Sequence, residues 1–219
     1  MNFLQYHINP EIEAFSTGKD TVLPYYVVQP HQVHGDNIAI VIDRNTTRGQ
    51  LEGIDALITN QCDCAIAVRT ADCVPILMFD PDRKVIAAVH SGWRGTVKGI
   101  VQKVINKMKE EFGTQSEAIL AVIGPSIGPE SFSVHEDVRD AFQHAMFPMN
   151  DICKPKEIGS FLIDLWKANK WLLEQAGVNP NNIQFSGICT YIHHEEFYSA
   201  RYEKDNKCGR NINVIKLKG

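Results

Sequence analysis

The sequence has no apolar run that approaches the roughly 20 residues a membrane-spanning helix requires. It also has no excess of basic residues, because 22 Lys and Arg residues are set against 26 Asp and Glu residues. The formal net charge of −4 differs from the basic character that nucleic-acid-binding surfaces usually show. We therefore expect neither a membrane nor a nucleic acid as a partner.

Features of a secreted protein are equally scarce. The first ten residues contain no long apolar segment of the kind that a secretory leader needs. Six cysteines are present, at positions 62, 64, 73, 153, 189 and 208. We expect a cytoplasmic location, where thiols stay reduced and each cysteine is a core residue, a metal ligand or a nucleophile.

The length and the apolar patterning predict one α+β domain over residues 1–219. Of the 219 residues 44% are hydrophobic, which is enough to bury a substantial core. Apolar positions at helical spacing predict helices over 96–112, 135–146 and 160–176, the first with Thr96 as N-cap and Gly113 at its end. Residues 148–159 are expected to form a loop. Predicted strands outnumber helices and occur in runs, which favours an α+β fold with mixed or antiparallel sheets.

The most informative stretch is 70–96. Two apolar runs, 74–79 and 85–89, flank an Asp-Pro-Asp turn, and this pattern predicts a β-hairpin. Cys73 precedes the first strand and His90 ends the second, so antiparallel pairing would bring a thiol and an imidazole together. Gly92 and Gly95 follow, and glycines allow the backbone to approach a ligand closely.

His34 lies beside Gly35 at the edge of another predicted strand, which makes it a third candidate donor. Two imidazoles and one thiolate suit zinc, and three protein ligands leave the fourth position open, as in catalytic sites. The spacing of His34, Cys73 and His90 matches no short metal motif, so for any one of them taken alone an isolated buried residue is the favoured interpretation. Cys73 and His90 could also form a metal-free nucleophile–base pair, and the metal content of the purified protein would separate the two readings.

Charged and polar residues near these positions are further candidates. Arg69, Arg94, Arg201 and Arg210 could hold an anionic substrate, or could be solvated charges and structural ion pairs. Asp72 adjoins Cys73 and could act as an acid or base, or could orient an imidazole. One more candidate is Ser126, in the Gly/Pro-rich loop that follows a predicted strand, where ligand contacts are common.

Several blocks of the sequence, in order, resemble a known family. That family was long labelled laccase-domain or polyphenol oxidase proteins and is now described as purine nucleoside phosphorylases. The matching blocks are Gln32-Val33-His34-Gly35, Asp55-Ala56-Leu57-Ile58-Thr59, Thr70-Ala71-Asp72-Cys73-Val74-Pro75, Val89-His90-Ser91-Gly92-Trp93-Arg94-Gly95, Ile123-Gly124-Pro125-Ser126-Ile127 and Phe197-Tyr198-Ser199-Ala200-Arg201.

The resemblance implies a four-layer α-β-β-α sandwich with helices on its outer faces. It also implies one zinc ion held by His34, Cys73 and His90. The family is credited with phosphorolysis of adenosine, inosine and methylthioadenosine and with deamination of adenosine, so purine nucleosides and phosphate are the implied partners. The labels of the family also include a copper-dependent phenol oxidase activity. Three ligands at one point, however, cannot build the several copper centres that a laccase needs.

The sequence departs from the family pattern in two places. The family usually carries an Arg-containing F-S-x-R-x-G-G block, whereas this chain has Phe15-Ser16-Thr17-Gly18-Lys19. The Arg-Arg pair usual after F-x-S-A is Arg201-Tyr202 here. Substrate contacts from those segments therefore do not carry over, and a metal- or nucleoside-binding protein without turnover remains an alternative to an enzyme.

Overall fold

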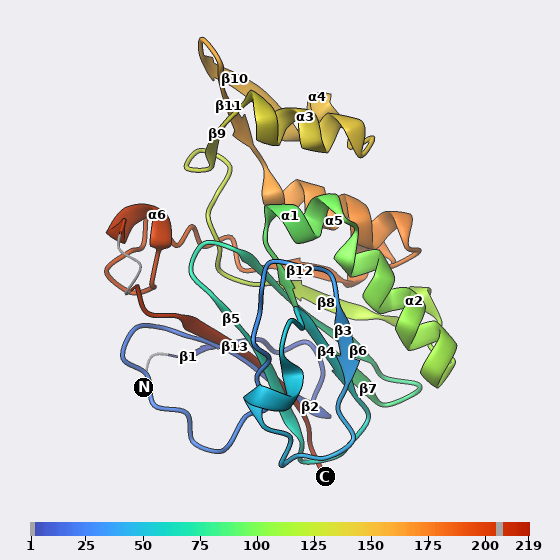
Figure 1. Ribbon diagram of the computed structural model, residues 1–219. Coiled ribbons are helices and arrows are strands. Elements are labelled where there is room, and N and C mark those ends of the chain that lie inside the picture. The colour runs from blue at the N-terminus through green and yellow to red at the C-terminus, as the bar shows by residue number, and fades with distance from the viewer. Residues whose placement is uncertain (1–2, 205–207) are drawn as a thin grey trace.

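The computed structural model describes residues 3–204 and 208–219 (Figure 1). Its centre is a six-stranded sheet with the strand order β12-β8-β6-β7-β4-β3. The predicted hairpin is present as β6 and β7, with Pro75 opposite His90. The strands of this sheet are β3 (Ile38–Ile40), β4 (Ala56–Thr59), β6 (Val74–Asp80), β7 (Val85–Ser91), β8 (Leu120–Ile123) and β12 (Ile183–Phe185).

A four-stranded antiparallel sheet packs against one face of the central sheet. Its order is β1-β2-β13-β5, and its strands are β1 (Phe3–Gln5), β2 (Ile12–Thr17), β5 (Ala65–Thr70) and β13 (Asn211–Leu217). Leu57, Leu77 and Phe79 from the central sheet meet Ile66 and Ile215 from the second sheet in one buried cluster. The space between the two sheets is therefore one of the apolar cores of the molecule.

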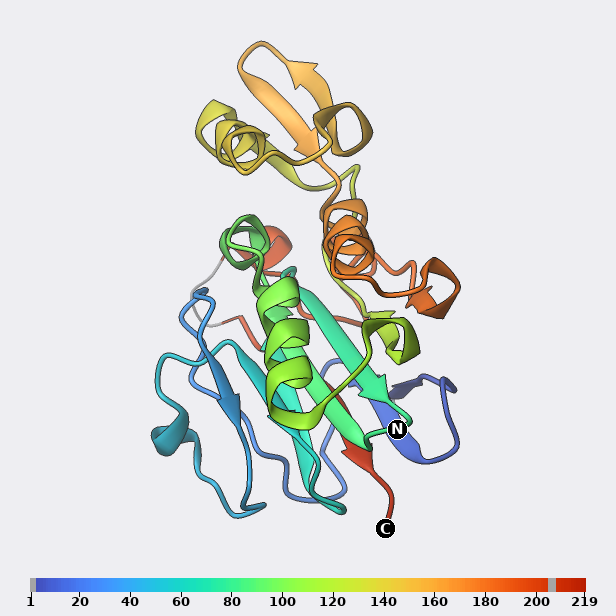
Figure 2. The ribbon, with the colours of Figure 1, turned by 90° about the vertical axis from the view of Figure 1, so that its right-hand side faces the viewer.

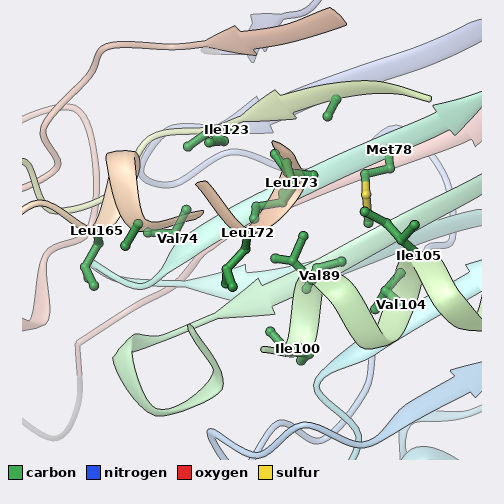
Figure 3. Close-up of a cluster of buried hydrophobic side chains, with 14 of the residues drawn as sticks. Val74, Met78, Val89, Ile100, Val104, Ile105, Ile123, Leu165, Leu172 and Leu173 are labelled. Carbon is green, nitrogen blue, oxygen red and sulfur yellow. The ribbon is translucent and has the colours of Figure 1, made fainter. Parts of the chain in front are cut away.

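The other face of the central sheet is covered by α1 (Trp93–Val97), α2 (Ile100–Phe112) and α5 (Leu165–Gln175), as Figures 1 and 2 show. The apolar face of α2 packs onto the sheet, and Figure 3 shows Ile100, Val104 and Ile105 among the strand side chains. The predicted α+β sandwich is confirmed. Within residues 3–204 and 208–219, however, the helices that cover a sheet lie on this face, and Leu23, Tyr25 and Val27 of an extended segment pack against the outer face of the four-stranded sheet.

The predicted helix over 96–112 is two helices. Gly99 has a φ of 69°, a left-handed conformation that interrupts the helix and precedes α2. Thr96 is therefore inside α1 and is not an N-cap, whereas Gly113 ends α2 with a φ of 72°, as the sequence suggests.

Residues between β8 and α5 form a lobe at one end of the sandwich (Figures 1 and 2). The lobe holds a three-stranded sheet, β10-β11-β9, and two helices. Its elements are β9 (Ser133–His135), α3 (Glu136–His144), α4 (Met149–Ile152), β10 (Cys153–Glu157) and β11 (Ser160–Ile163).

Two expectations for this lobe are wrong. Residues 148–159 contain α4 and β10 instead of a loop, and residues 160–163 are a strand instead of the first turn of a helix. The helix α5 starts only after Asp164, whose side chain accepts a hydrogen bond from the backbone N–H of Lys167 at 2.9 Å. Pairing of β11 with both β9 and β10 overrides the helical periodicity of this segment.

Three 3-10 turns, η1 (Arg48–Leu51), η2 (Ser116–Ala118) and η3 (Pro180–Asn182), and the short helix α6 (Ala200–Glu203) complete the described elements. Among the helices of residues 3–204 and 208–219, none combines the length and the apolar character needed to cross a membrane.

Candidate metal centre

Three side chains from separate parts of the chain meet at one end of the sandwich. The hairpin register brings Cys73, just before β6, next to His90 near the end of β7. His34 reaches the same point from the loop before β3, and one potential ligand atom of each residue lies within 4.8 Å of the other two. His90 is buried, Cys73 is half-buried and His34 is exposed, so the group opens to solvent on the side of His34.

Asp55 forms hydrogen bonds to two of these three residues, and the sequence did not identify it as a site residue. One carboxylate oxygen accepts a hydrogen bond from the ring Nδ1 of His90 at 2.7 Å and another from the backbone N–H of His34 at 3.0 Å. The second oxygen accepts from the backbone N–H groups of Gly35 at 2.8 Å and Val33 at 3.2 Å. Asp55 is fully buried and therefore fixes both the orientation of the His90 ring and the backbone that carries His34.

Close backbone approach explains why a glycine occupies position 92. A Cβ atom there would lie 3.0 Å from the sulfur of Cys73 and 3.3 Å from Cδ2 of His34. The loop after β7 can pass beside the two donors only because this residue has no side chain. His34 itself has a φ of 59°, an uncommon value for a residue with a side chain, and Asp55 holds that turn through its hydrogen bonds.

The electrostatics favour a thiolate at Cys73 and a proton on His90 when no cation is bound. Burial raises the pKa of Cys73, but His90 and His34 more than offset that effect and lower the pKa to about 6. Burial lowers the pKa of His90, whereas Cys73 and Asp55 raise it to about 9. Burial also raises the pKa of Asp55, but hydrogen bonds from His90 and Gly35 outweigh that effect. The pKa of Asp55 therefore lies below its ordinary value.

The donor set suits a transition-metal ion. Two imidazoles and a thiolate are good zinc ligands, and the hydrogen bond from Nδ1 to Asp55 leaves Nε2 of His90 for the metal. Within the described residues, His34, Cys73 and His90 form the group of His, Cys, Asp or Glu side chains whose ligand atoms lie close enough together to hold one metal ion. The same atoms also place Asp55, His90 and Cys73 in the order of a carboxylate–base–nucleophile triad, and His34 is the donor that a triad would not require.

We call His34, Cys73 and His90 the trio. A cavity of about 400 Å³ opens on one side of the trio. We call it the arginine cavity, because its lining combines the three side chains of the trio with the guanidinium groups of Arg48, Arg69 and Arg210. Arg69 and Arg210 were predicted as candidates for anion binding, and the structure places both in this cavity. Arg48 was not predicted, because a single arginine in a polar segment carries no distinguishing signal.

A second hollow, of about 420 Å³, lies beside His34 and Cys73. We call it the apolar hollow, and its apolar lining residues are Ala71, Ile127, Phe132 and Ala200. Arg201 also lines it, with its guanidinium 5.6 Å from the Phe132 ring and Nη1 donating to the carbonyl of Ser133 at 3.0 Å. The two hollows share residues of the trio, so a ligand in either one lies next to it.

Asp72 has structural partners on both carboxylate oxygens. One oxygen accepts from the hydroxyl of Thr190 at 2.7 Å, and the other accepts from the backbone N–H of Arg201 at 2.7 Å. Asp72 has a φ of 85°, a left-handed value that these bonds help to hold. It therefore ties the start of α6 to the residue before Cys73.

Two predicted site residues lie outside both hollows. Arg94 is exposed and its guanidinium stacks 4.3 Å from the ring of Trp93. Ser126 is fully buried, and its hydroxyl accepts a hydrogen bond from the indole N–H of Trp166 at 2.7 Å. The structure brings neither side chain to the lining of the arginine cavity or of the apolar hollow.

Comparison with known proteins identifies the family of this chain. Residues 17–218 match the family described as multi-copper polyphenol oxidoreductase laccase. The sequence is 42% identical over 202 residues to a purine nucleoside phosphorylase of Bacteroides thetaiotaomicron, covering 89% of this chain and 74% of the relative. It is 38% identical over 182 residues to adenosine deaminase RL5 of an unknown prokaryotic organism, covering 80% of this chain and 69% of the relative.

The fold also has a close structural counterpart. The crystal structure of the hypothetical protein YfiH of Bacillus licheniformis superposes with a TM-score of 0.91 at 25% identity, covering 99% of this chain and 97% of that one. The site and the fold thus define a laccase-like sandwich protein with a His-Cys-His donor group. The chain belongs to the multi-copper polyphenol oxidoreductase laccase family, whose relatives named above are a purine nucleoside phosphorylase and an adenosine deaminase.

Proposed function

We propose that this protein is a zinc-dependent purine nucleoside phosphorylase that acts on adenosine, inosine and methylthioadenosine and also deaminates adenosine. The observation that carries the proposal is the position of the trio between an arginine cavity and an apolar hollow. Phosphate and a purine nucleoside require an anion site and an apolar site next to one reaction centre. The names of two relatives, a phosphorylase and a deaminase, support the same two reactions.

His34, Cys73 and His90 would hold the metal. A zinc ion bound by them supplies Lewis-acid chemistry at an open coordination position. Asp55 keeps the ring of His90 in the orientation that presents Nε2, because it accepts the Nδ1 hydrogen bond at 2.7 Å. Asp72 acts as a positioning residue, since its carboxylate bonds to Thr190 and to the backbone of α6.

The arginine cavity would bind phosphate, and the apolar hollow would bind the purine nucleoside. In phosphorolysis a phosphate oxygen bonds to C1′ of the ribose while the bond from C1′ to the purine nitrogen breaks. The electron pair leaves with the purine, and the proton of hydrogen phosphate ends on the purine. Arg69 and Arg210 would hold the phosphate, and Phe132 and Arg201 would contact the purine side of the nucleoside.

Two alternatives have specific support. The triad order of Asp55, His90 and Cys73 fits a metal-free hydrolase. The family description names a multi-copper oxidoreductase, yet the described residues offer one trio of donors, which suits a single ion. His34 favours the metal over the triad, because it adds a third soft donor at the same point.

The test begins with elemental analysis of the purified protein and an assay of adenosine with and without phosphate. We expect about one zinc per chain, adenine and ribose 1-phosphate only when phosphate is present, and inosine under both conditions. Cys73→Ala should lose the metal and should form neither adenine nor inosine. Cys62→Ala should keep the metal and both activities, because Cys62 is an exposed thiol that does not line either hollow. Zinc-loaded protein that releases no adenine contradicts the phosphorylase proposal, and turnover that survives complete metal removal favours the hydrolase.

A further inference from the structure

Three guanidinium groups share the arginine cavity without any carboxylate among its described lining residues. Arg69 comes from β5, Arg210 from the residue before β13, and Arg48 from the first position of the 3-10 turn η1. In the described part of the chain none of the three forms an ion pair with Asp or Glu. Like charges in one cavity repel each other, so an anion bound between them would stabilise the arrangement.

The side chains of Arg69 and Arg210 have few partners of their own. The Nε of Arg69 is buried and has no hydrogen-bond partner among the described residues. Arg210 donates from Nη1 to the backbone carbonyls of Cys208 and Gly209. All three arginines line the same cavity, and burial, then the charges of Arg48 and Arg210, lower the pKa of Arg69.

The backbone around the cavity is held firmly. The side chain of Gln32 accepts from the backbone N–H of Arg69 at 2.8 Å and donates to its carbonyl at 2.8 Å. Gln32 lies two residues before His34, so this pair of bonds fixes the distance between Arg69 and the metal trio. The cavity is therefore preorganised on the side of β5 before any anion arrives.

The turn that carries Arg48 is attached to the same segment. Leu51, the last residue of η1, is buried, and its carbonyl accepts a hydrogen bond from the backbone N–H of His31 at 3.0 Å. The side chain of Gln50 accepts from the backbone N–H of Thr47 at 2.8 Å and closes the start of the turn. Arg48 itself is exposed and lines the cavity, so an anion bound there lies next to its side chain.

We propose that Arg48 completes a three-arginine subsite that binds inorganic phosphate as the co-substrate and makes phosphate recognition depend on the turn η1. This inference rests on the proposed function for the identity of the co-substrate. The planar guanidinium offers paired N–H donors that match the oxygen spacing of a phosphate, which a lysine cannot reproduce. Arg69, which is half-buried, binds the phosphate from inside the cavity, and the exposed Arg48 and Arg210 bind it from the solvent side.

The test measures binding of inorganic phosphate to the zinc-loaded protein by calorimetry, at constant ionic strength adjusted with chloride. We expect Arg48→Met to weaken phosphate binding by about 10- to 100-fold, the loss expected for a charge-assisted pair of hydrogen bonds. Arg48→Lys should recover only part of the affinity. Arg44→Met is the matched control, since Arg44 is an exposed arginine of the same segment that does not line the cavity.

Steady-state kinetics give a second readout. Arg48→Met should raise the KM for phosphate by a factor similar to the loss of affinity and should raise the KM for adenosine far less. Unchanged phosphate affinity in Arg48→Met overturns the inference, because phosphate would then bind without Arg48. Protein that binds AMP but not inorganic phosphate overturns it as well, because the subsite would then accept a phosphate ester.

These outcomes separate this inference from the broader proposal. If the parent protein binds phosphate in an Arg48-dependent way but releases no adenine, the phosphorylase proposal fails and the anion subsite stands. If the parent releases adenine and Arg48→Met does so with an unchanged KM for phosphate, the phosphorylase proposal stands and the role of Arg48 is wrong.

Discussion

Replacement of Asp55 by asparagine is the sharpest test of how the candidate metal centre is built. The carboxylate accepts four hydrogen bonds, from the ring of His90 and from the backbone N–H groups of Val33, His34 and Gly35. An asparagine of the same shape keeps one oxygen, which can continue to face His90 and His34. Its amide group would then point two N–H donors at the N–H groups of Val33 and Gly35.

The cost follows from the number of bonds lost. Two charge-assisted hydrogen bonds are worth about 3–6 kcal/mol together, and the partly exposed loop 33–35 can relax and reach water. We therefore expect Asp55→Asn to lower the free energy of unfolding by roughly 2–4 kcal/mol. For a chain of this size such a loss corresponds to a decrease in Tm of about 4–16 °C. Loosening His90 should also weaken zinc binding about 10- to 100-fold.

Thermal unfolding followed by circular dichroism gives the first quantity, and competition with a chromophoric chelator gives the second. Asp82→Asn is the control, because Asp82 is an exposed turn residue whose replacement should change stability by less than about 0.5 kcal/mol. A variant Asp55→Asn with the parent's Tm and the parent's zinc affinity would refute the reasoning, because it would show that the buried carboxylate neither holds the His34 loop nor orients His90.

Two further changes test local features. Gly92→Ala should weaken zinc binding at least about tenfold, because the added Cβ would lie 3.0 Å from the sulfur of Cys73; Gly49→Ala, which meets no atom within 4 Å, should leave chelator competition unchanged. Asp36 pairs with two lysines of the segment 98–103, chiefly Lys103, and its pKa is lowered by them against a smaller opposing effect of burial. Its stabilising effect is therefore present above its unfolded pKa of about 3.9 and is lost as the pH falls through its lowered value. We expect Asp36→Asn to lower Tm at pH 7 and the difference from the parent to shrink below about pH 4; a difference that persists at lower pH would show that the ion pairs are not its cause.

Local sequence signals predicted the parts of the fold that depend on near neighbours. The Asp-Pro-Asp turn and the apolar runs beside it predicted the β6–β7 hairpin, and the structure has that hairpin with Pro75 opposite His90. The apolar stripe of α2 and the glycine at position 113 also agree with the structure. Turn chemistry and helical periodicity act over a few residues, so a single sequence contains them in full.

The errors in the fold have two causes, which are distant contacts that override local signals and one glycine inside a helical pattern. Residues 160–163 have the periodicity of a helix but pair with β9 and β10, and the lobe they form turns residues 148–159 into a helix and a strand. Gly99 interrupts a helical pattern that is otherwise continuous, because a glycine can take the left-handed conformation. The roles of Arg94 and Ser126 stay predictions, and their side chains lie against Trp93 and Trp166, outside the lining of the two hollows.

The sequence by itself determined that Cys73 and His90 come together, because the hairpin joins the two residues through one short turn. It also supplied the third donor, His34, and the family to which the chain belongs. Only the tertiary structure decided that Asp55 lies beneath the trio and that Arg48 joins Arg69 and Arg210 in one cavity. Those contacts depend on the order and register of strands from both sheets, and strand order is a property of the packed sandwich that no local stretch of residues encodes.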